Sequence, residues 1–142
     1  MATVSPYLNF NGNCEEAFNF YKSIFGGEFS YFGRYSEMPS EQPIPESEAN
    51  KVMHVSLNLG NTTIMGSDVS EVFGQICLPG NNINLSINAD SMEEANKIFN
   101  ELSVDGKISM PMQSTFWGAY FGSLEDKFGI NWMINFDEAQ NQ

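Results

Sequence analysis

The sequence predicts an α+β fold in which two tandem βαβββ units form a curved mixed sheet around a cleft. An internal duplication supports this prediction, because 8-LNFNGNCEEAFNFY-21 is similar to 85-LSINADSMEEANKIF-99, about half the chain length away. Each copy opens with alternating apolar and polar residues, the period of a strand, and continues with apolar residues at helical spacing. We therefore expect one domain over residues 1–142, made of the halves 1–80 and 81–142.

The first helix of each half has recognisable start and stop signals. Asn13 and Ser91 suit the N-cap position, because their short polar side chains can accept a hydrogen bond from the first turn. Gly26-Gly27 ends the first helix, and Asp105-Gly106 follows the second. Each half thus begins with a strand and a helix.

Three further strands are expected after each helix. Gly60-Asn61 predicts a tight hairpin between the last two strands of the first half, and the segment Asp126–Gly129 predicts a turn near the end of the second. The expected strands are 28–35, 51–60, 62–67, 107–110, 117–124 and 130–136. The segment 37-EMPSEQPIPESEAN-50 has three prolines, four glutamates and no periodicity, which predicts a mobile acidic loop, either a plain connection or a lid.

Composition limits the partners. Six basic residues against 18 acidic ones give a net charge of -12, which repels nucleic acid and anionic membranes. A neutral or cationic small molecule is compatible with this charge, although acidity can also serve solubility alone. The opening MATVSPYLNF lacks a signal-peptide pattern, and Cys14 and Cys77 lack metal-type spacing, so we expect free thiols and a cytoplasmic location.

Alternate residues divide every expected strand into two faces. One face is apolar and is expected to pack under the helices, as with Leu8, Phe10, Val55, Leu57 and Ile134. The other face carries mostly uncharged polar residues: Ser5, Tyr7, Asn9, His54, Ser56, Asn58, Thr63, Met65, Ser67, Asn82, Asn84, Ser86, Asn131, Met133 and Asn135. A solvated sheet would carry more charge, so these faces either line a binding cleft or are covered by a partner or by the other half.

Three segments resemble a known family. The stretches 7-YLNFNGNCEEAFNFYKSIFGGE-28, 64-IMGSD-68 and 117-WGAYFGSLEDKFGINWMIN-135 are similar to the PhnB-like branch of the vicinal oxygen chelate superfamily, often labelled 3-demethylubiquinone methyltransferase-like. That superfamily includes glyoxalase I, bleomycin-resistance proteins and extradiol dioxygenases. The resemblance covers essentially the whole chain and implies tandem βαβββ units in a homodimer.

The resemblance also implies where a metal would be bound. Metal-using members carry mostly His and Glu ligands on the first and fourth strands of each unit, and the matching positions here are Ser5, Met65, Asn82 and Met133. None of these residues is His, Asp or Glu, and the chain has one histidine, so a two-histidine site within a protomer is excluded. We therefore expect no metal and no cofactor.

Several residues remain candidates for chemistry. His54 could act as a general base or contact a ligand, or be a structural hydrogen bonder, and Asp68 could bind a ligand or cap the segment that follows it. Trp117 and Tyr120 could form an aromatic wall for a planar or cationic guest. The predicted ligand-binding set is Tyr7, His54, Asp68, Asn82, Trp117, Tyr120 and Met133.

These observations favour a glyoxalase/bleomycin-resistance-like small-molecule binding protein without the usual metal site. The alternative is a divalent-metal-dependent lyase, isomerase or dioxygenase with a non-standard site, in which His54 is the sole nitrogen ligand and Asp68 lies nearby. A structural dimer without a ligand is a third possibility. No nucleophile elbow, P-loop or dinucleotide fingerprint is present in the sequence, which leaves open whether the chain is an enzyme.

Overall fold

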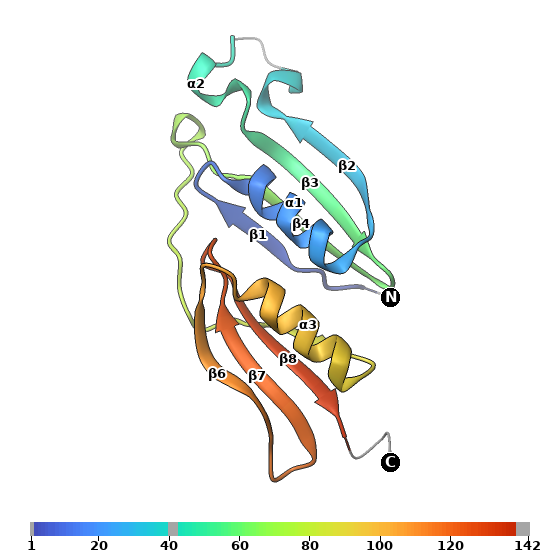
Figure 1. Cartoon of the computed structure of the whole chain (residues 1–142). Helices are drawn as coiled ribbons and strands as arrows, with labels where there is room; N and C mark the ends of the chain where they lie inside the picture. Colours follow the sequence, from blue (N-terminus) through green and yellow to red (C-terminus); the bar gives the residue numbers. More distant parts are fainter. Residues whose placement is uncertain (1, 40–42, 139–142) are drawn as a thin grey trace. The chain divides into compact units, whose positions relative to one another are not determined.

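The computed structural model describes residues 2–39 and 43–138 (Figure 1). The chain divides into two compact units, Met1–Leu78 (unit 1) and Pro79–Gln142 (unit 2). Each unit has a four-stranded mixed sheet with a helix on one face, so the α+β class and the tandem arrangement are confirmed. The cleft stays a prediction. Among the described residues, no helix has the length and apolar character needed to cross a membrane.

Unit 1 follows the predicted order of strand, helix and three strands. Its elements are β1 (Tyr7–Phe10), α1 (Cys14–Phe25), β2 (Glu28–Arg34), η1 (Tyr35–Glu37), α2 (Glu46–Ala49), β3 (Val52–Leu59), β4 (Thr62–Asp68) and η2 (Glu71–Phe73). The strand order is β1-β4-β3-β2, with β1 parallel to β4 and the other neighbours antiparallel. Leu59 pairs with Thr62, so Gly60-Asn61 is the predicted two-residue hairpin turn.

Unit 2 repeats this topology. Its elements are β5 (Leu85–Asn88), α3 (Met92–Leu102), β6 (Lys107–Ser114), β7 (Ala119–Glu125) and β8 (Asn131–Asp137), and its strand order is β5-β8-β7-β6. Strand β6 extends four residues beyond its predicted end, because Pro111 lies on an edge strand, where a missing N–H is tolerated. Strand β7 begins two residues later than predicted, because Phe116 and Trp117 form the preceding turn.

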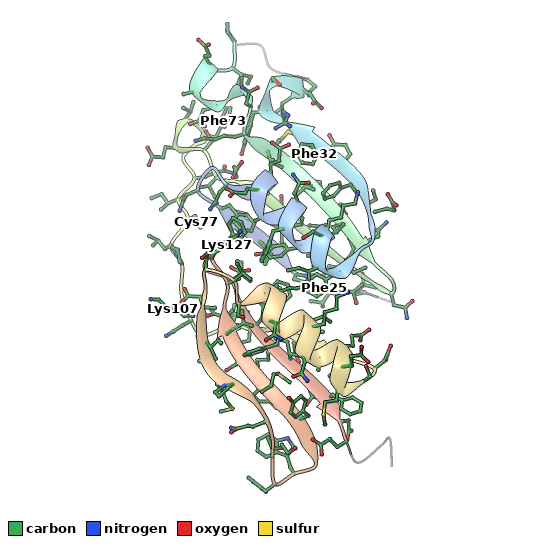
Figure 2. The ribbon with its side chains drawn as sticks, in the orientation of Figure 1. Phe25, Phe32, Phe73, Cys77, Lys107 and Lys127 are labelled. Carbon is green, nitrogen blue, oxygen red and sulfur yellow. The ribbon has the colours of Figure 1, made fainter. Side chains whose placement is uncertain are left out.

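The core of each unit lies between its helix and its sheet (Figure 2). In unit 1, a Cβ at Gly66 would lie 2.6 Å from a ring carbon of Phe18, so the ring rests directly on the backbone of β4. In unit 2, Gly122 similarly accommodates Phe99, whose ring would be 3.0 Å from a Cβ there. The duplicated unit therefore uses the same device twice, an aromatic helix residue seated on a strand glycine.

The two helices begin differently, which corrects one prediction. The Ser91 hydroxyl accepts a hydrogen bond from the Glu94 N–H at 3.0 Å, as expected of an N-cap. Asn13 occupies the N-cap position of α1, but its side chain makes no capping hydrogen bond. Asp68 takes over this function, since its Oδ1 accepts hydrogen bonds from Gly12 N and Cys14 N at 2.9 Å each. A carboxylate distant in sequence has replaced the local cap.

The acidic segment 37–50 is partly ordered into structure that its sequence did not predict. Helix α2 lies within it, and residues 40–42 lie outside the described residues. Its base is closed by a hydrogen bond from Tyr35 N to Lys51 O, 3.1 Å long. Glu48 is buried beside Lys51, with 2.7 Å between its Oε2 and Nζ. The lid function proposed for this segment stays a prediction.

An ion pair ties helix α1 to strand β2 and predicts a pH effect. The two terminal nitrogens of Arg34, Nη1 and Nη2, donate to Glu15 at 2.9 and 2.8 Å, and this hydrogen bonding lowers the pKa of the Glu15 carboxyl. A lowered folded-state pKa adds stability above the unfolded pKa, and that stability is lost as pH falls through the folded pKa. The effect is below about 1 kcal/mol, because both side chains are partly exposed.

We therefore expect Glu15→Gln to be slightly less stable than wild type at pH 7, with the difference shrinking as the pH is lowered to 3. Urea unfolding followed by circular dichroism across that range measures it. Glu16→Gln changes the neighbouring, exposed carboxylate and is the matched control. A Glu15→Gln deficit that persists unchanged at pH 3 would contradict the ion-pair explanation.

Candidate functional site

The candidate site in unit 1 lies on the sheet face opposite α1, called the open face here. Tyr7 pairs with Met65, Met65 with Ser56, and Ser56 with Tyr31, so one uncharged row crosses all four strands. Val55 and Leu57, which flank Ser56 along β3, are fully buried on the other face. The predicted alternation along β1, β3 and β4 thus places a neutral row on the open face.

Three rings meet on this face, and we call them the Tyr–His–Tyr cluster: Tyr7, His54 and Tyr31. The Tyr7 hydroxyl lies 3.1 Å from His54 Nδ1, and the ring centroids of both tyrosines lie 5.6 Å from that of His54. Tyr7 is 43% exposed and Tyr31 is 49% exposed, although both are large aromatic side chains. The cluster is therefore a partly exposed aromatic surface that carries hydroxyl and imidazole groups.

Tyr31 lies flat over its own strand because residue 33 is glycine. A Cβ at Gly33 would lie 2.7 Å from the Tyr31 hydroxyl oxygen and 2.9 Å from a ring carbon. The β2–β3 register also shifts between Phe29 and Tyr31 and again after Gly33, and such irregularities redirect side chains. Sequence reasoning missed Tyr31, and the glycine inside strand β2 was the available signal of a close approach.

Unit 2 carries a counterpart of this face that lacks the histidine. Met133 pairs with Ser86 and Ser123, as Met65 pairs with Tyr7 and Ser56. Phe121 precedes Ser123 by two residues, as His54 precedes Ser56, so Phe121 occupies the position of His54. The structure thus repeats the methionine and the serine in both units but replaces histidine with phenylalanine in unit 2.

Trp117 is grouped with other aromatic residues than the predicted Tyr120. Trp117 lies in the turn before β7, is 59% exposed, and contacts Phe116 and Phe121 at centroid distances of 5.0 and 6.4 Å. Tyr120 does not join it, because its hydroxyl donates to Asn96 Oδ1 of helix α3 at 2.7 Å. The strand alternation sends Tyr120 to the helix side and Phe121 to the open face.

The other predicted ligand contacts are scattered. Asn82 lies in an exposed bend before β5 rather than on the strand, and Met133 is half-buried on the open face of unit 2. Ser5 is exposed before β1, and Met65 is half-buried beside Tyr7. The structure therefore groups Tyr7 with His54, and it does not bring either of them to Asp68.

Asp68 is buried on the helix side of the sheet and is 1% exposed. Its Oδ1 accepts from Gly12 N and Cys14 N, and its Oδ2 accepts from Val52 N, each at 2.9 Å. The Tyr35 hydroxyl donates to the Asp68 backbone carbonyl at 2.8 Å. Burial raises the pKa of Tyr35, and the negative charge of Asp68 raises it further. This arrangement gives Asp68 a structural role, joining the starts of α1 and β3.

The donor groups do not fit the metal centre that the family resemblance implies. The four matching positions offer a hydroxyl, two thioethers and an amide, which are weak ligands beside imidazole and carboxylate. Within residues 2–39 and 43–138, no three His, Cys, Asp or Glu side chains are grouped so that they could hold a metal ion. Burial raises the pKa of the Cys14 thiol, so that group is not a ready thiolate either.

Comparison with known proteins places this geometry in a family. Residues 2–135 match the family described as 3-demethylubiquinone-9 3-methyltransferase. The chain is 34% identical over 145 residues to protein YjdN of Escherichia coli (strain K12), covering 96% of this chain and 97% of that one. The structure of PA1353 from Pseudomonas aeruginosa matches with a TM-score of 0.86 and 35% identity, over 96% of this chain and 98% of that one.

Two further structures extend the comparison. A putative 3-demethylubiquinone-9 3-methyltransferase, PhnB protein, from Bacillus cereus matches with a TM-score of 0.74 and 29% identity, over 95% and 99% of the two chains. A glyoxalase/bleomycin resistance protein/dioxygenase family enzyme from Burkholderia phytofirmans PsJN shares the fold, with a TM-score of 0.60 and 18% identity over 92% and 96%. The chain therefore belongs to the family described as 3-demethylubiquinone-9 3-methyltransferase, and it shares its fold with the glyoxalase/bleomycin resistance/dioxygenase family enzyme.

Proposed function

We propose that this protein binds an uncharged or cationic small molecule on the open face of unit 1, without a metal. The Tyr–His–Tyr cluster is the observation that carries the proposal. Both tyrosine rings contact the His54 ring and are partly exposed, and the uncharged Met65 and Ser56 lie between the two tyrosines in the strand register. Aromatic side chains with a few placed polar groups are the usual lining of a small-molecule site.

Electrostatics supports a neutral or cationic ligand over an anion. The row Tyr7, Met65, Ser56 and Tyr31 has no charged member, and the whole chain carries a net charge of -12. The faces of tyrosine rings attract cations, and a strongly acidic protein disfavours the approach of anions. The open face of unit 2, with Trp117 and Met133, is a second candidate surface for the same kind of ligand.

The alternative metal-dependent enzyme has less support. It needs His54 and Asp68 in one coordination sphere, but they lie on opposite faces of the same sheet. Asp68 also has both carboxylate oxygens engaged by backbone N–H groups. Methyl transfer, named in the family description, has no recognisable nucleotide-binding turn in this sequence. We therefore favour ligand binding over either reaction.

Thermal unfolding of metal-stripped protein tests this proposal against a library of uncharged and cationic aromatic compounds and, separately, against Zn, Ni, Mn, Fe(II) and Mg ions. A ligand present at a hundred times its dissociation constant stabilises the native state by about 2.7 kcal/mol. We expect saturable stabilisation by at least one organic compound and none by the metals. Saturable stabilisation by one metal, at one ion per chain, would favour the enzyme instead.

Two variants locate the binding surface. Tyr31→Ala is expected to weaken binding of the organic compound about fivefold or more, because an aromatic contact contributes about 1 kcal/mol. Trp117→Ala removes an exposed aromatic side chain from unit 2 and is the matched control. Loss of binding in Trp117→Ala alone would place the ligand on unit 2 and overturn the assignment to the Tyr–His–Tyr cluster.

A further inference from the structure

We propose that Tyr7 holds neutral His54 in the tautomer that carries its proton on Nε2, so that the site selects ligands with an acceptor oxygen. This inference rests on the proposed function. His54 is the only histidine of the chain, and among the described residues Tyr7 alone hydrogen bonds to its ring. Nε2 is therefore the ring nitrogen left for a ligand on the open face.

The chemistry of the two groups sets the direction of their hydrogen bond. A phenol is a good O–H donor but a poor acceptor, because its oxygen lone pairs are delocalised into the ring, whereas the unprotonated imidazole nitrogen is a strong acceptor. We therefore assign the Tyr7 hydroxyl as the donor and Nδ1 as the acceptor in their 3.1 Å contact. In a neutral imidazole the other nitrogen then carries the hydrogen. His54 is accordingly a donor to whatever binds beside it.

Tyr31 adds a second requirement. One side of its ring covers Gly33, and the side chain is 49% exposed. Its ring is also in contact with that of His54, so a flat group stacked on Tyr31 lies beside the His54 ring. The geometry points to an uncharged, planar, conjugated compound that carries a carbonyl-type oxygen. A compound whose only polar group is an N–H donor leaves the Nε2–H without an acceptor, which costs binding energy.

The tautomer can be measured without any ligand. Long-range ¹H–¹⁵N correlation of the imidazole at about pH 8.5, where an ordinary histidine is neutral, gives a single set of ring signals because the chain has one histidine. We expect the ¹⁵N shifts to place the proton on Nε2, and Tyr7→Phe to increase the fraction of the Nδ1–H form. A wild-type spectrum dominated by Nδ1–H would overturn the proposal.

A pair of probes tests the selectivity. Coumarin is planar and uncharged with a carbonyl acceptor, and indole is planar and uncharged with only an N–H donor. We expect coumarin to bind more tightly than indole, and Tyr7→Phe to weaken coumarin about two- to tenfold, the range of a single hydrogen bond, while indole is unchanged. Tyr120→Phe, which removes the unit 2 hydroxyl that donates to Asn96, should change neither affinity.

The outcomes separate this inference from the proposed function. Tighter binding of indole, equal binding of both probes, or no binding of coumarin overturns the acceptor selectivity. If other library compounds then bind in a manner that depends on Tyr31, the proposed function stands and only the selectivity fails. If no compound stabilises the protein, the proposed function fails, whatever tautomer the spectrum shows.

Discussion

Asp68→Ala is expected to lower the free energy of unfolding by about 3 kcal/mol or more, one of the two largest effects predicted for this protein. The substitution leaves three backbone N–H groups without their acceptor, those of Gly12, Cys14 and Val52. Each unsatisfied buried donor costs about 1–3 kcal/mol, and partial hydration of the helix start reduces the total. Urea unfolding followed by circular dichroism at pH 7 measures the loss.

Two further variants sharpen the test. Asp68→Asn keeps one acceptor oxygen and places an N–H₂ group against a backbone donor, so we expect an intermediate loss. Asp90→Asn changes an exposed aspartate just before α3 and should stay within about 0.5 kcal/mol of wild type. If Asp68→Ala were as stable as the Asp90 control, Asp68 would not be the structural acceptor, and the earlier hypothesis of a ligand-binding carboxylate would regain support.

The fold was predictable because its signals are local and repeated. The duplicated strand–helix segment, the Gly60-Asn61 hairpin and the alternation along β3 each determine their own structure, and each was read correctly. Strand ends were less accurate where an edge strand tolerates Pro111 or where a turn takes Phe116 and Trp117. These boundaries depend on neighbouring strands, which a single sequence does not show.

The site was only partly predictable, for a related reason. Tyr7 and His54 follow simple alternation, so the sequence placed both on the open face. Tyr31 was not predicted as a site residue, because register shifts in β2 interrupt the alternation of the two faces. Trp117 and Tyr120 were assigned to one wall, but two-residue periodicity applies only after Ala119, where the strand begins. Where the backbone is irregular, the alternation of residues in the sequence therefore no longer shows on which face of the sheet a side chain lies.

The roles of the two buried aspartates could not be predicted from the sequence either. Asp68 and Asp126 are 1% and 3% exposed, and each carboxylate accepts three hydrogen bonds from its own unit. In the sequence Asp126 begins a predicted turn, and Asp68 is a candidate ligand contact or cap. Their donors come from backbone N–H groups or a buried indole, which the sequence does not reveal as partners. A carboxylate that completes a fold can thus be mistaken for one that binds a ligand.

Asp126→Ala is the unit 2 counterpart and is expected to cost about 3 kcal/mol. Asp126 accepts from Phe128 N at 2.8 Å and Ile130 N at 3.0 Å, which shapes the β7–β8 turn, and from Trp132 Nε1 at 2.8 Å. Trp132 is 3% exposed, so its indole N–H would be left buried without this acceptor. The turn and the core of unit 2 therefore depend on one side chain.

The chain has two tryptophans, so a Trp117→Phe background isolates the fluorescence of Trp132. With a urea dependence of about 1–2 kcal/mol per molar, the Trp132 transition should move down by roughly 1.5–3 M urea in Asp126→Ala. Glu125→Gln alters the adjacent, half-buried carboxylate and should move it little. Equal midpoints for the two variants would show that the turn closes without the carboxylate. A large shift for Asp126 alone would establish that one buried acceptor holds the turn and Trp132 together.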